Sequence, residues 1–205
     1  MKNVLNLKIM GLLAGFMLMI TIVQAQEVKI GVRVGVNISN QQFKQGELTV
    51  EPKSKFGLDL AVVSDIPLGE VVSFAPELHW LQKGFVIEDF DNPPVTFDEG
   101  TATLNYLELP LLIKFNFGET AKFFVMGGPS IGYLLDHKLV IDGEDNDDLF
   151  EFDNRLELGA HLGAGIGIGP VVVDLRYLLG ISNITDEPDA EIKNNGFGAG
   201  VSLMF

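Results

Sequence analysis

The chain has 205 residues, with 28 acidic against 14 basic side chains, a formal net charge of −14 and no cysteine. A surface this acidic repels polyanions and tells against a nucleic-acid partner. A chain without cysteine has no disulfide bonds, so its stability must come from packing.

The first 25 residues predict a secretory signal peptide. Lys2 and Lys8 are their only charged side chains, an apolar run covers residues 9–23, and Val23-Gln24-Ala25 supplies the small residues of a cleavage site. A retained membrane anchor is the alternative, but the run is shorter than the ~20 residues that a spanning helix needs. We therefore expect a mature domain of residues 26–205, with 12 basic against 28 acidic side chains and a formal net charge of −16.

Downstream, apolar residues alternate with polar or small residues in eight runs, the pattern of β-strands with one oily and one polar face. The hairpin over residues 105–134 shows the design, because Leu107, Leu109 and Ile113 fall on one face and Glu108 and Lys114 on the other. The runs cover residues 28–38, 56–62, 72–80, 107–117, 122–133, 155–166, 171–180 and 196–205. They predict an all-β fold, an eight-stranded antiparallel up-and-down transmembrane β-barrel.

The connections between the runs alternate between long and short. The long ones cover residues 39–53, 88–101, 136–154 and 182–194, and the short ones cover 66–70, 118–120 and 167–169. Outer-membrane barrels of Gram-negative bacteria have this asymmetry, with short turns in the periplasm and long loops outside the cell. The pattern predicts a location in the cell outer membrane, with lipid around the barrel.

A water-soluble eight-stranded barrel is the alternative, because it also alternates but turns its oily face inward. Here the other face is rich in glycine and charge, which suits a narrow polar lumen. Aromatic residues on the oily face gather towards the strand ends, as in the interfacial girdles of membrane barrels. These residues are Trp80, Phe115, Phe117, Phe123, Tyr133, Tyr177, Phe197 and Phe205. Both features favour the membrane barrel.

The inward faces carry charged residues of both signs in equal number. The basic ones are Lys29, Arg33, Lys114, Arg155 and Arg176, and the acidic ones are Asp59, Glu77, Glu108, Glu157 and Asp174. An eight-stranded barrel is only wide enough for its own side chains, so we expect these charges to pair and plug the lumen. Gly196, Gly198 and Gly200 of the last run are expected to leave room for Arg33 and Lys29. A narrow selective pore is the alternative interpretation.

Catalysis would need a nucleophile and a base near one rim of the barrel. The histidines are His79, His137 and His161, of which His79 shares a face with Glu77, and His161 shares one with Glu157. A base oriented by an acid can be drawn at either position. Residues i and i+2 are neighbours in any strand, however, so the spacing marks no catalytic pair. We predict that the protein is not an enzyme.

The loop over residues 142–153 is strongly acidic and offers the hard oxygen ligands that Ca²⁺ prefers. Asp147 stands where an EF-hand loop requires glycine. A solvated acidic loop is the simpler interpretation, and we predict no metal or other cofactor.

Several stretches of the mature chain carry a family pattern. They are residues 31–37 (GVRVGVN), 76–78 (PEL), 82–84 (QKG) and 106–111 (YLELPL) followed by Lys114, with a glycine-rich close on Phe205. Together they resemble the PorT-like outer-membrane β-barrel family of Bacteroidota. The resemblance implies insertion by the barrel-assembly machinery, with Phe205 as the assembly signal. Most members have no assigned activity, so it implies no specific task.

These patterns favour a structural or interaction protein, a small barrel whose long loops meet a protein partner outside the cell. The alternative functions are an outer-membrane enzyme acting on lipid or peptide at the rim, and a narrow pore.

Overall fold

The structure is a computed structural model that describes residues 28–45, 48–50, 52–92, 95–118, 121–146, 155–183 and 190–205. Its strands are β1 (Lys29–Gln45), β2 (Leu48–Val50), β3 (Lys53–Pro67), β4 (Val72–Asn92), β5 (Val95–Phe117), β6 (Ala121–Ile141), β7 (Glu144–Asp145), β8 (Leu156–Ile168), β9 (Val171–Gly180) and β10 (Ala190–Met204). No helix in these ranges is long and apolar enough to cross a membrane. The signal-peptide prediction lies outside the described residues.

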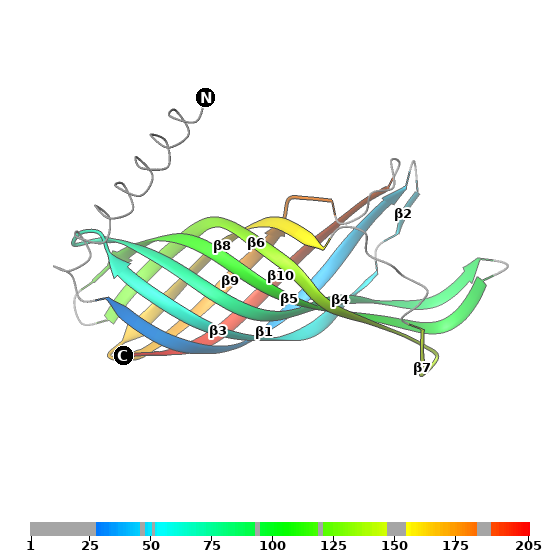
Figure 1. Cartoon of the computed structure of the whole chain (residues 1–205), viewed down its shortest axis with the longest axis horizontal. Coiled ribbons are helices and arrows are strands. Elements are labelled where there is room, and N and C mark those ends of the chain that lie inside the picture. The colour runs from blue at the N-terminus through cyan, green and yellow to red at the C-terminus, as the bar shows by residue number, and fades with distance from the viewer. Residues whose placement is uncertain are drawn as a thin grey trace, which may run out of the picture.

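Eight of the strands close into an antiparallel barrel (Figure 1). In chain order, β1, β3, β4, β5, β6, β8, β9 and β10 each pair with the next. The last strand returns to the first in a long antiparallel register that runs from Gly31 opposite Met204 to Gln45 opposite Ala190. Closure satisfies the backbone groups that an open sheet edge would leave unpaired in hydrocarbon. The predicted eight-stranded antiparallel fold is confirmed.

Side chains alternate between a polar interior and an apolar exterior. Along β1, Val32, Val34 and Val36 are each about half exposed, whereas Arg33 and Asn37 at the alternate positions are each 1% exposed. The outer face therefore forms the apolar band of a membrane barrel, and the charged residues lie inside. Of the predicted girdle, Phe115, Phe117, Phe123, Tyr133, Phe197 and Phe205 are exposed on the outside, and Trp80 and Tyr177 are partly exposed there.

The two ends of the barrel differ. The short-turn end carries the turns after β3, β5 and β8 and both ends of the described chain, and one of these turns uses Gly169 at φ 60°. The long-hairpin end carries the longer connections, and the β4–β5 hairpin projects furthest beyond the barrel (Figure 1). The predicted long and short connections fall at opposite ends.

The strands run further into the predicted long loops than the sequence indicated. β4 continues to Asn92 and β5 begins at Val95, so most of the predicted loop 88–101 is paired strand. A register irregularity at Asn105 and Tyr106 changes which residues of β6 point inward. The inward residues are even-numbered up to Leu134, whereas the inward Leu139 is odd-numbered, and this change hides the alternation from sequence inspection. Phe85, Ala102 and Leu139 then form a buried cluster that joins the three strands above the lumen.

Candidate functional site in the barrel lumen

Six ionisable side chains form a closed ring across the middle of the lumen. Arg33 of β1 contacts Asp59 of β3, which contacts His79 of β4, and the chain of contacts continues through Glu77, Arg176 and Asp174 back to Arg33. Each member touches one member on either side. We call Arg33, Asp59, His79, Glu77, Arg176 and Asp174 the charge ring.

The contacts within the charge ring are short and fully desolvated. Arg33 donates from Nε to Asp174 Oδ2 at 3.0 Å and from Nη2 to Asp174 Oδ1 at 2.9 Å, which is a bidentate fork. Arg176 donates from Nε to Asp174 Oδ1 at 2.6 Å, and its Nη1 donates to Glu77 Oε2. All six residues are at most 6% exposed. Charges removed from water this completely need such partners, because desolvation alone would be costly.

The ring also spans the full width of the barrel. Glu77 lies on β4 and Arg176 on β9, and four strand steps separate these strands in either direction around the closed sheet. Their ion pair therefore crosses from one wall to the opposite wall. Side chains therefore meet across the diameter at this level, as expected for so narrow a barrel.

Small residues on neighbouring strands make the space for these long side chains. Arg33 stands opposite Ala61 and Ser202, and Asp174 and Arg176 stand opposite Gly200 and Gly198 of β10. A Cβ atom at Gly200 would overlap the Arg33 guanidinium, whereas one at Gly198 would have no neighbour closer than 3.7 Å. The expectation that glycines leave room for Arg33 holds at Gly200. The expectation was wrong for Lys29, which lies opposite Asp65 and lines a cavity at the short-turn end of the barrel.

A second cluster lies nearer the long-hairpin end. Lys83 Nζ of β4 is 2.9 Å from Glu157 Oε1 of β8 and 3.1 Å from Glu108 Oε2 of β5. His161 Nε2 is 2.7 Å from Glu108 Oε1, and Asn194 Nδ2 donates to Glu157 Oε2 at 2.7 Å. We call Lys83, Glu108, Glu157, His161 and Asn194 the upper cluster. His161 also meets the charge ring, since its ring centroid is 6.2 Å from that of His79.

The predicted lumen residues divide by position. Arg33, Asp59, Glu77, Asp174 and Arg176 lie in the charge ring, and Glu108 and Glu157 lie in the upper cluster. Lys114 pairs with Asp65 at 2.6 Å near the short-turn end. Arg155 and Lys29 lie outside both clusters, as a correction to the prediction, because each sits at a strand end and is exposed to solvent.

Three ionisable residues of the two clusters, Lys83, His79 and His161, were not among the predicted network, and neither was the amide side chain of Asn194. Lys83 falls within the Gln-Lys-Gly stretch where strong alternation has ended, but it is an odd-numbered residue of β4 like Glu77 and His79. Extending that parity along β4 would have found it. His79 and His161 were considered only as bases for catalysis, although their inward parity also placed them among the lumen charges.

The histidines His79 and His161 are held by carboxylates and buried. His79 Nδ1 is 2.6 Å from Asp59 and Nε2 is 2.7 Å from Glu77, so both ring nitrogens face acceptors. His161 is oriented by Glu108, and not by Glu157 as its sequence position suggested. His79 is 1% exposed and His161 is 2% exposed. A general base must reach the proton that it abstracts, and neither ring reaches an open surface.

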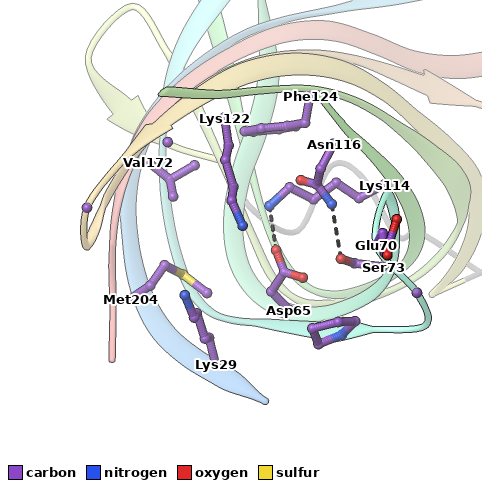
Figure 2. Close-up of a pocket in the computed structure, with 14 residues that line it drawn as sticks. Lys29, Asp65, Glu70, Ser73, Lys114, Asn116, Lys122, Phe124, Val172 and Met204 are labelled. Atoms are coloured by element: carbon purple, nitrogen blue, oxygen red, sulfur yellow. Dashed lines mark hydrogen bonds and ion pairs between the residues drawn. The ribbon is translucent and has the colours of Figure 1, made fainter. Parts of the chain in front are cut away.

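The short-turn end holds an open cavity of about 360 Å³ (Figure 2). Lys29, Lys114 and Lys122 enter it from three strands, with Asp65 at its floor and Phe124 on its wall. A smaller cavity of about 30 Å³ lies deeper, between Lys114 and the charge-ring members Glu77, Asp174 and Arg176. That volume is about the share of one water molecule. The open mouth therefore ends at the charge ring.

Within the described ranges, no group of three or more histidine or carboxylate side chains is placed so that it could hold a metal ion. The acidic segment 142–153 is described only up to residue 146, so most of its candidate Ca²⁺ ligands lie outside the described residues. Asp142 there accepts a hydrogen bond from the Glu99 backbone N–H at 2.9 Å, and Asp145 pairs with Lys138 at 2.9 Å.

An apolar outer band, a closed antiparallel sheet and a charged interior define a transmembrane β-barrel. A family model described as outer membrane protein beta-barrel domain matches residues 24–186. The chain belongs to this family and is a protein of the outer membrane.

Solved structures of small outer-membrane barrels resemble the chain at low identity. The attachment invasion locus protein Ail of Yersinia pestis is 15% identical over 88% of this chain and 100% of that one, with a TM-score of 0.46. Neisserial surface protein A is 12% identical over 85% and 97%, with a TM-score of 0.45, and the outer membrane enzyme PagL is 9% identical over 82% and 98%, with a TM-score of 0.42. A search of curated proteins finds no match. Similarities this distant carry no argument about function.

Proposed function

We propose that the protein is a non-conducting, non-enzymatic barrel that anchors long hairpins in the outer membrane for contact with a protein partner outside the cell. The observation that carries the proposal is the closed charge ring, whose Glu77–Arg176 pair joins opposite walls of the barrel. A pore needs a continuous water path, and this pair stands across it. A lumen filled by its own ion pairs serves as a rigid support.

Two features of the long-hairpin end suit contact with a partner. The β4–β5 hairpin stays paired out to Asn92 and Val95, well beyond the charged lumen. At its base, Phe85, Ala102 and Leu139 are buried together, which stiffens the hairpin where it leaves the barrel. A projecting hairpin with a packed base needs little ordering when a partner binds, and preorganisation of this kind favours affinity.

An enzyme at the rim is the second candidate, and the burial of His79 and His161 speaks against these residues as its base.

Three more specific assignments are part of the proposal. They are membership of the PorT-like group of Bacteroidota, removal of residues 1–25 as a signal peptide, and insertion by the barrel-assembly machinery with Phe205 as its signal. Phe205 is 71% exposed on the outer face, where a terminal aromatic is accessible.

The plug is tested by conductance in planar bilayers. We expect the wild-type barrel to show no steady current, because the charge ring crosses the lumen. A Glu77→Ala, Arg176→Ala double variant should open measurable current. The matched control removes an exposed pair, Lys53→Ala with Glu88→Ala, and should stay silent. Stable, ion-selective openings of the wild type would replace the plug with a pore.

The partner is tested by photo-crosslinking in intact cells. A crosslinking residue at position 99, where Glu99 is exposed near the base of the β4–β5 hairpin, should capture one discrete protein. The same residue at position 70, where Glu70 is exposed at the short-turn end, is the control and should not capture it. Capture of the same species from both positions, or from neither, would contradict recognition through the long hairpins.

A further inference from the structure

The cavity at the short-turn end gathers positive charge in a chain that is otherwise strongly acidic. Lys29 of β1, Lys114 of β5 and Lys122 of β6 line it, and the acidic residues lining it are Asp65 and Glu70. Figure 2 shows the amino groups of the three lysines turned into the same space from different walls. Among the described residues, this is a local excess of one positive charge against a formal net charge of −14 for the chain.

The three lysines differ in their contacts with acidic side chains. Lys114 Nζ is 2.6 Å from Asp65 Oδ2 and also lies over the Phe124 ring, 4.3 Å from its centroid. Lys29 and Lys122 have no ion-pair partner in the part of the chain that the structure describes, although both line the same cavity. Cations that face each other across a cavity repel unless an anion lies between them.

The rest of the lining sets the kind of anion that fits. Phe124, Val172 and Met204 form an apolar wall beside the amino groups, and a volume of about 360 Å³ suits a small molecule. Ammonium groups bind phosphate and carboxylate as point charges, without the planar geometry that a guanidinium imposes. The lining residues of β1, β5, β6 and β10 are those of the inward face, so the cavity opens along the barrel axis, and a soluble ligand has access where a bilayer lipid does not.

We propose that this cavity is a binding site for a small soluble anion from the periplasm. Lys29 and Lys122 hold the phosphate or carboxylate group of the ligand, and its apolar part rests on Phe124, Val172 and Met204. The Lys114–Asp65 pair forms the floor of the site. The charge ring beyond it stops the ligand, so the site binds and does not conduct.

The methionines provide a direct reporter. Met204 lines the cavity, whereas Met126 lies outside it, next to the smaller cavity behind the floor. In the detergent-solubilised barrel labelled with ¹³C-methyl methionine, phenyl phosphate should shift the Met204 methyl signal saturably and by more than that of Met126, which packs behind Phe124. Inorganic phosphate should bind more weakly because it lacks the apolar part, and benzyl alcohol should not bind because it lacks the charge. Added salt should weaken binding by screening.

Charge variants decide between a site and non-specific binding. Lys29→Gln and Lys122→Gln should each raise the dissociation constant for phenyl phosphate by about tenfold, the equivalent of one charge-assisted hydrogen bond. Glu70→Gln removes a negative charge at the rim and should lower it. Lys53→Gln, at the opposite end of the barrel, is the matched control and should leave it unchanged. The proposal is overturned if Met204 does not shift, or if the Lys29 and Lys122 variants bind as the wild type does.

Discussion

The charge ring and the upper cluster occupy the same lumen but solve the problem of buried charge differently. In the ring, two arginines and His79 alternate with three carboxylates, and every member has a partner on each side. In the upper cluster, one lysine serves both Glu108 and Glu157, and the contacts branch to His161, Asn194 and the Tyr106 ring. The His161 Nδ1 atom is buried and has no hydrogen-bond partner among the residues that the structure describes. The charge ring is a single cycle in which acids and bases alternate, whereas the upper cluster branches from one lysine.

The difference follows from the donors. A guanidinium presents five N–H groups in a planar fork, so Arg33 reaches Asp59 and Asp174 on different strands at once. An ammonium is a compact point charge, and Lys83 holds two carboxylates without fixing the geometry of either. Arginine therefore lies where walls must be tied together, and lysine lies where charge only has to be balanced.

The largest effect is expected from breaking the closed ring. Arg33→Met leaves Asp59 and Asp174 each short of a partner in a buried setting, which should lower the free energy of unfolding by about 3–5 kcal/mol. Urea unfolding in lipid vesicles, followed by fluorescence of the only tryptophan, Trp80, measures this change. Lys53→Met breaks an exposed pair with Glu88 and should cost at most about 1 kcal/mol.

The same measurement sharpens the comparison between the two clusters. Lys83→Met should also be destabilising, but Arg33 and Lys83 share no carboxylate. Their effects should therefore add in the double variant to within about 0.5 kcal/mol. A larger coupling energy would show that the contact between the His79 and His161 rings makes the two clusters one network.

The fold was predictable because inward-facing polar residues and outward-facing apolar residues alternate along each strand of a membrane barrel. The polar residues Arg33, Asp59 and Asp174 stand among apolar neighbours at a strict period of two, and closure follows from the need to leave no open edge. The extent of β4, β5 and β6 was not predictable in this way. Between Tyr106 and the long-hairpin end the register shifts at a bulge, and strand pairing there depends on contacts between strands that a single sequence does not display.

The site was predictable in membership but not in pairing. Parity along each strand shows which charges point inward, and it correctly placed Glu77 and Arg176 inside. Which inward charges meet depends on strand tilt and stagger, which a period of two does not encode. For that reason Lys29 and Arg155, near strand ends, were assigned to a network that they do not join, and the cavity beside Lys29 was not foreseen.

A smaller effect than the loss of Arg33 is expected from the packing of the charge ring against the backbone, compared with that of the upper cluster. Gly200→Ala places a methyl group where the Arg33 guanidinium lies, and the guanidinium cannot move without leaving Asp59 or Asp174. Overpacking of this kind typically costs about 1–3 kcal/mol. Gly132 stands next to the upper cluster, where a Cβ would lie 3.3 Å from the Tyr106 ring and 3.7 Å from Glu157.

Gly132→Ala should therefore cost less than Gly200→Ala, because its neighbours need to shift by only a few tenths of an ångström. Gly198→Ala is the control for replacing glycine in β10 itself, since its Cβ would meet nothing closer than 3.7 Å. Heat-modifiable gel migration reports whether each variant folds, and urea unfolding reports the cost. The closed ring predicts that Gly200→Ala is the least stable of the three. Equal stability of the Gly200 and Gly198 variants would mean that Arg33 can leave its bidentate contact at little cost, and the ring would then be no more rigid than the upper cluster.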